Sequence, residues 1–280
     1  MSHEIELKLA LAETGPERLL CHPLLRAGVE AARRLTNTYY DTPEGELEAA
    51  RVALRLRRYG EHRVQTLKSG GEGTGGYSRR REWEWPVEGD DLDREGLAGL
   101  TSQAGLEMGW IDRLEPRFTT DFERRIWQLD LAQARIEVAL DQGEIRAADR
   151  RVPIRELELE LKDGDPQALW SLALSLAESV PLRPADASKA ARGGALLTGH
   201  WTLPQGESPS TWLHRALLAL DAFGDTGEDD WRAAAREAFG RLADGGEDDA
   251  RRLAALLGEP DWLGVDFGRM ALRLAQRLAP

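Results

Sequence analysis

The chain has 280 residues, of which 41% are hydrophobic and 31% are charged, so it is long enough for one large domain or two smaller ones with a buried core. Its formal net charge of −12 argues against a general nucleic-acid-binding protein. The single cysteine, Cys21, excludes an internal disulfide and a thiolate metal cluster, and with no signal-like start and no apolar run approaching roughly 18 residues we expect a cytoplasmic protein without membrane contact.

Lysine is rare in this chain. Only four of the 37 basic residues are lysines, and arginine is used almost everywhere else. Lysine offers a compact point charge, whereas arginine offers a planar fork of donors. The retained lysines are therefore candidates for positions that need a compact cation, namely Lys8, Lys68, Lys162 and Lys189.

The chain opens with a strictly alternating segment. In residues 4–11, Glu4, Glu6 and Lys8 share one face, and the residues between them are leucine or isoleucine. This period of two predicts a strand with one polar and one apolar face.

Similar alternation returns along the next 160 residues or so. After a helix over 16–30, we expect strands over 36–41, 52–59, 63–69, 80–85, 117–129, 135–145 and 153–162. The glycine-rich stretch 70–76 is expected to be a flexible loop, because no Gly-Lys-Ser/Thr sequence ends it as in a phosphate-binding P-loop. Further helices are expected over 91–105, 166–179 and 187–197.

This pattern predicts an α+β fold built on a closed antiparallel eight-stranded β-barrel with flanking helices, which we assign to residues 1–204. Because leucine, valine and tryptophan alternate with the charged residues, we expect the apolar face to pack against helices outside and the charged face to line a tunnel. Residues 205–280 show helical spacing of alanine and leucine, and we expect a small all-α module of four short amphipathic helices.

Paired carboxylates are the first chemical signal. Two glutamates at i and i+2 on a strand point the same way, roughly 6–7 Å apart at the backbone, and hard cations such as Mg²⁺ or Mn²⁺ prefer such oxygen ligands. The pairs are Glu4/Glu6 and Glu158/Glu160, with Asp141 as a further carboxylate. One isolated pair is also common on a solvated sheet, so the basic residues on other strands decide the interpretation. Together the two signs neutralise each other and suit a complex of metal and polyphosphate.

The sequence resembles the CYTH domain, or triphosphate tunnel metalloenzyme, superfamily. The segment Glu4-Ile5-Glu6-Leu7-Lys8 matches its Glu-x-Glu-x-Lys signature. The similarity continues in the expected order through 39–42, 54–57, 66–68, 80–82, 120–124, 136–143, 156–161 and 188–193. It therefore covers about residues 1–200.

The resemblance is closest to bacterial inorganic triphosphatases, which cleave tripolyphosphate to pyrophosphate and phosphate with Mg²⁺ or Mn²⁺. It implies two metal ions during turnover, with metal ligands at Glu4, Glu6, Asp141, Glu158 and Glu160. It implies substrate-binding residues at Lys8, Arg55, Arg57, Lys68, Arg80, Arg124, Lys189 and Arg192, the last two from a late helix. The residues expected to carry catalysis are Glu4, Glu6, Lys8, Glu158 and Glu160, supported by the tunnel carboxylates Glu82, Glu84, Glu137 and Glu156.

Two alternatives stay open at this point. The same superfamily includes cyclases and hydrolases of organic triphosphates such as ATP and thiamine triphosphate, and a non-catalytic polyphosphate-binding module would keep the basic residues. Trp83, Trp85 and Trp127 have outward parity, which indicates packing and favours an inorganic substrate. The expected partner is thus a small polyanion and not a nucleic acid or a membrane. The C-terminal helices are expected to pack against the barrel or to mediate self-association.

Overall fold

The computed structural model describes residues 2–26, 29–100 and 108–279. Within these residues the strands are β1 (Ser2–Leu11), β2 (Ala31–Asp41), β3 (Ala53–Tyr59), β4 (His62–Lys68), β5 (Tyr77–Pro86), β6 (Glu115–Leu131), β7 (Ala134–Ala147), β8 (Arg150–Gly164) and β9 (Leu182–Pro184). Eight of them form a closed antiparallel ring in the order β1-β5-β4-β3-β2-β6-β7-β8, and β8 pairs with β1 to close it. The expected α+β fold with a closed eight-stranded barrel is confirmed.

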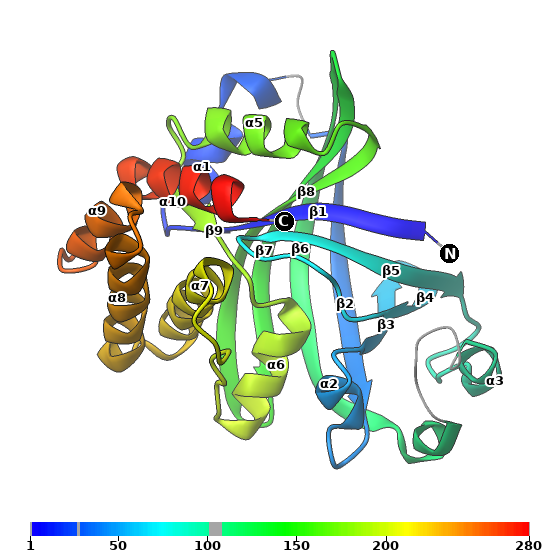
Figure 1. Ribbon diagram of the computed structural model, residues 1–280. Helices are drawn as coiled ribbons and strands as arrows, with labels where there is room; N and C mark the ends of the chain where they lie inside the picture. Colours follow the sequence, from blue (N-terminus) through cyan, green and yellow to red (C-terminus); the bar gives the residue numbers. More distant parts are fainter. Residues whose placement is uncertain (1, 27–28, 101–107, 280) are drawn as a thin grey trace.

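Helices cover one side of this barrel more densely than the other (Figure 1). The α-helices are α1 (Gly15–Leu20), α2 (Glu46–Ala49), α3 (Arg94–Ala98), α5 (Gln167–Leu176), α6 (Lys189–Thr198), α7 (Pro209–Thr226), α8 (Asp229–Asp244), α9 (Asp248–Leu256) and α10 (Val265–Leu278), and the 3-10 helices are η1 (Pro23–Leu25) and η2 (Met108–Arg113). In the part of the chain described, no helix combines the length and apolar character needed to cross a membrane.

The helix expected over 16–30 is wrong. Helix α1 ends at Leu20, and a 3-10 helix follows, because Pro23 has no amide hydrogen to continue an α-helix. The next strand, β2, begins at Ala31 instead of residue 36, and it pairs with β6 over its whole length. Of the helix expected over 91–105, the structure forms α3, and residues 101–107 lie outside the described residues.

The outer face of the barrel packs against the helices. Leu7, Val138 and Leu159, on neighbouring strands, are fully buried and belong to one hydrophobic cluster with α5 and the helices α7 to α10. The same cluster holds Trp127, while Trp83 is buried in a second cluster with α3 and η2. The expected packing of these tryptophans and the four expected C-terminal helices are therefore confirmed. The boundary at residue 204 stays a prediction, since buried residues on both sides of it share this cluster.

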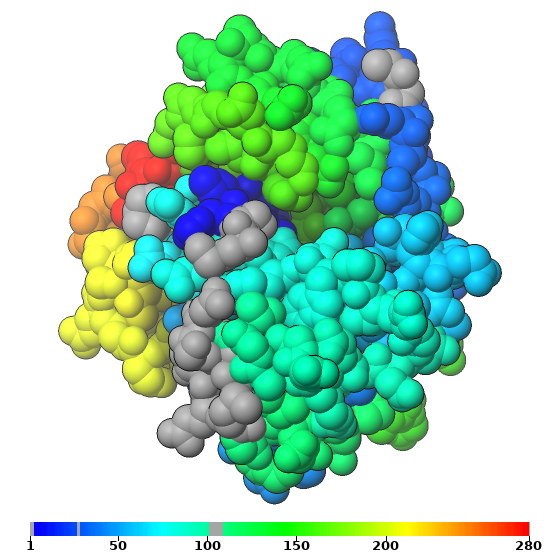
Figure 2. Space-filling view, turned by 90° about the vertical axis from the view of Figure 1, so that its right-hand side faces the viewer, coloured from blue at the N-terminus to red at the C-terminus, as the bar shows by residue number. Residues whose placement is uncertain are grey.

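Strand β1 occupies a central position in the barrel wall. One of its edges pairs with β8, and the other pairs first with β5 over Ser2–Leu7 and then with β9 over Leu9–Leu11. Figure 2 shows the start of the chain, in dark blue, between the cyan and green parts of the wall. The inward-facing side chains of β1 therefore lie between those of β5 and β8.

We expect the substitution Leu159→Ala to lower the free energy of unfolding by about 2–5 kcal/mol, because it removes buried methyl groups and leaves a cavity between Leu7 and Val138. Equilibrium urea unfolding measures this change. Leu131→Ala is a matched control at the exposed end of β6, where the expected change is within about 0.5 kcal/mol. Equal effects at the two sites would contradict the placement of Leu159 in the core.

Candidate active site

The barrel encloses a cavity of about 310 Å³ whose charged lining consists of eight basic and eight acidic side chains. The basic residues are Lys8, Arg55, Arg57, Lys68, Arg80, Arg124, Lys162 and Lys189. The acidic residues are Glu4, Glu6, Glu82, Glu84, Glu137, Glu156, Glu158 and Glu160. The cavity lining thus includes every predicted site residue except Asp141 and Arg192, and it also includes Lys162, a retained lysine that the sequence analysis did not assign to the site. The shared parity of residues 158, 160 and 162 on β8 is the sequence signal that could have identified Lys162.

The first carboxylate cluster lies on β1. Lys68 Nζ contacts the two carboxylate oxygens of Glu4 at 2.8 and 2.9 Å. Arg80 bridges the pair, with Nε donating to Glu4 at 2.7 Å and Nη2 to Glu6 at 2.6 Å. These contacts follow from the register, because Glu4 pairs with Arg80 across β1 and β5. The two glutamates therefore form ion pairs with cations from two other strands.

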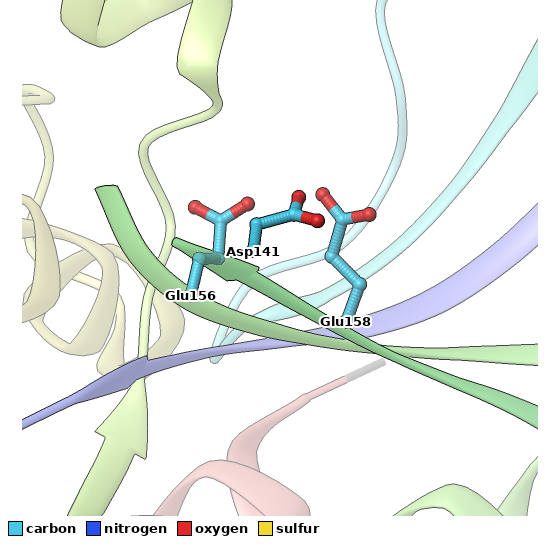
Figure 3. Close-up of side chains that lie close together, drawn as sticks. All are labelled: Asp141, Glu156 and Glu158. Carbon is cyan, nitrogen blue, oxygen red and sulfur yellow. The ribbon is translucent and has the colours of Figure 1, made fainter. Parts of the chain in front are cut away.

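The second cluster is formed by Asp141 on β7 and by Glu156 and Glu158 on β8. Figure 3 shows that the three carboxyl groups project to the same side of these strands, and oxygens of the three lie within 4.8 Å of one another. Lys189 Nζ contacts all three, with distances of 2.7 Å to Asp141 and 2.8 Å to Glu158. Arg124 makes a two-pronged pair with Asp141, at 2.7 Å for each bond, and also contacts Glu158. Asp141 is fully buried behind Arg124 and Lys189, which is why it does not line the cavity.

Three cations in the lining have weaker partners. Among the described residues Lys8 Nζ donates only to the backbone carbonyl of Asp186, at 3.3 Å, and Arg57 Nε donates to the side-chain oxygen of Asn37, at 2.9 Å. Neither forms an ion pair with any carboxylate among the described residues. Arg55 reaches Glu82 only at 4.0 Å, and its buried Nε has no hydrogen-bond partner in the described structure. These donors are the ones available to an added anion.

Burial and charge set the protonation of the site. Burial of Arg57 beside Arg55 and Arg124 lowers the pKa of its guanidinium to about 9. Burial raises the pKa of Glu156 to about 7 against the attraction of Lys189. Burial also opposes ionisation of Glu158, but Arg124 and Lys189 outweigh it and hold its pKa well below the usual range. The pKa values of Glu156 and Glu158, two glutamates on β8, are thus shifted in opposite directions.

Arg192 is not part of this cavity. Its guanidinium pairs with Asp225 on α7, with Nε donating at 3.0 Å, and its Nη2 also donates to the carbonyl of Pro153. The expectation that Arg192 faces the substrate is therefore corrected. One helical turn earlier, Lys189 points into the tunnel, so α6 carries one cation for the cavity and one for the C-terminal helices.

The residues present fit a divalent cation. All three side chains of the second cluster offer hard oxygen ligands, and an ammonium group already lies among these oxygens, where positive charge is favourable. The β1 pair offers a second set of oxygens that now hold Lys68 and Arg80. A metal ion at either cluster would replace a cationic side chain, which would then be available to an anion.

The fold and the site define a closed antiparallel barrel whose interior carries balanced charges of both signs. The chain matches the CYTH domain model over residues 2–193, and it belongs to the CYTH domain family.

Two relatives extend this comparison. Over 198 residues the chain is 36% identical to an inorganic triphosphatase of Haemophilus influenzae, and the match covers 69% of this chain and 54% of that protein. The chain thus spans about half the length of this curated relative. Among solved structures, a Hippeastrum protein studied as a candidate adenylyl cyclase, with a dominant triphosphatase activity, aligns with a TM-score of 0.51 and 19% identity, over 71% of this chain and 97% of that one. At this identity the likeness concerns the fold alone.

The substitution Glu4→Gln is expected to change the acid stability of the metal-free protein. Burial opposes ionisation of Glu4, but Lys68 and Arg80 outweigh it and lower its pKa from 4.5 to about 2. Because the folded-state pKa is depressed, the ionised carboxylate stabilises the fold above about pH 4.5, and this contribution of about 3 kcal/mol is lost as the pH falls toward 2.

Urea unfolding at a series of pH values without divalent cations tests this expectation. The difference in unfolding free energy between the wild type and Glu4→Gln should shrink steadily from pH 5 to the lowest pH at which the protein folds. Glu61→Gln, in the exposed turn between β3 and β4, serves as a control whose difference from the wild type should not change. A constant difference for Glu4→Gln would show that its ion pairs do not shift its titration.

Proposed function

We propose that this protein hydrolyses inorganic triphosphate to pyrophosphate and phosphate, with Mg²⁺ or Mn²⁺ as cofactor, inside the barrel. The observation that carries the proposal is the cavity of about 310 Å³ with eight cations and eight carboxylates on its wall. Cations suit the phosphate oxygens, and carboxylates suit the metal ions that accompany a polyphosphate. Membership of the CYTH domain family and the relationship to an inorganic triphosphatase support the same activity.

The cations without close ion-pair partners among the described residues are the proposed substrate-binding residues. Burial, together with repulsion from Arg55 and Arg124, lowers the pKa of Arg57, and an anion near its guanidinium would oppose these effects. The buried Nε of Arg55 needs an acceptor, and a phosphate oxygen is a strong one. Lys8 can replace its hydrogen bond to the Asp186 carbonyl by one to a charged phosphate oxygen. Four further cations would contact the substrate if metal ions held the carboxylates that now pair with them, namely Lys68, Arg80, Arg124 and Lys189.

The proposed metal ligands are Glu4, Glu6, Asp141, Glu158 and Glu160, and the oxygens converging with Asp141 and Glu158 add Glu156 to this set. Bound Mg²⁺ or Mn²⁺ would supply Lewis-acid activation of the phosphoanhydride and of a water molecule. Lys and Arg side chains stabilise the charge that develops on the leaving pyrophosphate. Among the described residues of the cavity lining there is no cysteine or histidine, and Ser188 Oγ caps α6 by accepting the N–H of Ala191. Direct attack by water therefore fits this chain better than a covalent intermediate.

A second candidate function rests on one further cavity. A pocket of about 660 Å³ adjoins the tunnel, shares Lys8, Lys68 and Arg80 with it, and includes Tyr40, Phe118 and Trp201 in its wall. Aromatic side chains can stack on a heterocycle. This pocket favours an organic triphosphate, with its phosphates in the tunnel and its organic group in the pocket, as the alternative substrate.

Phosphate release from tripolyphosphate, ATP and thiamine triphosphate, each with Mg²⁺, Mn²⁺ or a chelator, tests the proposal. We expect the largest kcat/KM for tripolyphosphate and no turnover with chelator. Glu160→Gln should reduce metal-dependent turnover at least a hundredfold while the thermal midpoint stays near that of Glu61→Gln. Faster cleavage of ATP or thiamine triphosphate would replace the inorganic substrate by the organic one, and turnover in chelator would overturn the metal dependence.

The substitution Arg57→Gln tests the grip on the substrate. Loss of a charged hydrogen bond of about 1.5–3 kcal/mol corresponds to an increase in KM of about ten- to a hundredfold. Because Arg57 has no described ion-pair partner, the stability should change little. Arg34→Gln, which removes an exposed ion pair with Asp121 outside the cavity, is the matched control with an unchanged KM. An unchanged KM for Arg57→Gln would remove Arg57 from the proposed binding set.

A further inference from the structure

Helix α7 carries three ionisable side chains that contact the segment leading into α6. His214, Asp221 and Asp225 are spaced seven and four residues apart, so they lie along one face of the helix. Their partners lie in residues 183–192, which contain the last two residues of β9, the connecting loop and the first turn of α6. Two lysines of the cavity depend on this segment, because Lys189 belongs to it and Lys8 donates to it.

Asp221 is the centre of these contacts. It is almost fully buried, and one oxygen accepts a hydrogen bond from Arg183 Nη1 at 2.7 Å. The other oxygen accepts the backbone N–H groups of Asp186, at 2.9 Å, and Ala187, at 2.7 Å. One carboxylate therefore fixes both the side chain at the end of β9 and two consecutive peptide groups of the loop.

The peptide group between Asp186 and Ala187 connects α7 to Lys8. Its N–H donates to Asp221, and its carbonyl oxygen accepts the bond from Lys8 Nζ at 3.3 Å. Because a peptide group is planar, the two bonds cannot change independently. Rotation of this group away from Asp221 would also turn the carbonyl away from Lys8.

The same loop ends at Lys189. Ser188 caps α6, so Lys189 occupies the first helical position, two residues after Ala187, whose N–H is anchored by Asp221. One turn along α6, Arg192 is held by Asp225 of α7. The N-terminal turn of α6 is thus fixed by α7 on both sides of Lys189.

A third contact ties in the glycine-rich loop. The Asp186 carboxylate accepts the N–H of Gly76 at 2.6 Å and the hydroxyl of Thr74 at 3.2 Å, and His214 Nδ1 lies 2.6 Å from it. Gly76 has a φ of +84°, and a Cβ there would lie 2.5 Å from the carbonyl oxygen of Lys8. The end of this loop, expected to be flexible, is therefore held close to β1 and α7.

We propose that Asp221 is a positioning residue for the tunnel, and that α7 sets the placement of Lys8 and Lys189 through the loop before α6. The C-terminal helices are then part of the machinery that holds the polyphosphate, although they contribute no side chain to the cavity lining described above. As far as catalysis is concerned, this inference rests on the proposed function. The geometric part does not, and it is tested without substrate.

The scarcity of lysine makes the geometric test direct. The chain has four lysines, and all of them line the cavity. In protein labelled with ¹³C-lysine, each side chain gives its own Cε signals, which single Lys→Arg variants assign. We expect Asp221→Asn to shift the signals of Lys8 and Lys189 and to leave those of Lys68 and Lys162 in place, because these two contact β1, β5, β7 and β8 and not the loop.

Matched variants separate positioning from loss of folding. Asp229→Asn removes an exposed partner of Arg232 on α8 and should shift none of the four signals. Asp225→Asn should shift Lys189 without Lys8, since Asp225 contacts only Arg192 within the segment. This variant also keeps the test decisive if Asp221→Asn leaves Arg183 without its buried partner and prevents folding. Four unchanged signals in the folded variants, or equal shifts of all four, would overturn the proposal.

The kinetic part uses the triphosphate that the wild type cleaves. Asp221→Asn should lower kcat at least tenfold at a pH and temperature where it is fully folded, and Asp221→Glu should recover part of the loss. A wild-type rate in a variant whose lysine signals have shifted would contradict the catalytic part alone. If the wild type cleaves no triphosphate, the proposed function fails while the lysine signals still decide the geometric part.

Discussion

Charge balance inside the barrel is the constraint on which the rest of the structure depends. Eight cations and eight carboxylates share a cavity of about 310 Å³, where unpaired charges would be expensive. Some charged side chains lie in register with a partner of opposite sign, as Glu4 does opposite Arg80 and Arg124 opposite Asp141. Where the register places like charges opposite each other, as with Asp141 and Glu156, a cation from another element lies between them, here Lys189. The apolar residues between them must then face outward, so the helices that cover Leu7 and Leu159 are a consequence of the same alternation.

The same balance explains how such an interior can bind a charged ligand. In an ion pair such as Lys68 with Glu4 neither side chain is free. A phosphate group alone would pair with Lys68 and leave Glu4 without a counter-charge, and a metal ion alone would pair with Glu4 and leave Lys68 without one. In the proposed reaction the carboxylates would hold metal ions, and the cations that now pair with these carboxylates would be available to the phosphate oxygens. Among the described residues Arg55 and Arg57 have no close ion-pair partner, and this makes them suited to contact the anion.

Much of the barrel and most of the cavity could be predicted from the sequence, because a period of two assigns each side chain to a face without knowledge of the pairing. That rule also places Lys162 on the tunnel face at the end of the strand expected over 153–162, although we did not include it among the expected site residues. It fails where local chemistry hides the pattern, as in β2, where Arg33 and Arg34 obscure a strand that its pairing with β6 stabilises. The alternation also does not indicate how deeply a side chain is buried, so the complete burial of Asp141 behind Arg124 was seen only in the structure. The partner of Arg192 lies 33 residues away on another helix, and no local signal in the sequence points to it.

The composition changes near residue 205, whereas the physical contacts do not. Phe239 and Phe267 share a hydrophobic cluster with the outer face of β1, and the acidic residues of α7 accept hydrogen bonds from the loop that orients Lys189. A segment that places no side chain in the described cavity lining can still influence the tunnel by fixing backbone groups at its wall. The peptide group held by Asp221 also fixes the hydrogen-bond acceptor of Lys8. The structural unit that forms the tunnel therefore includes α7, because the hydrogen bonds of the tunnel wall extend beyond the point where the amino-acid composition changes.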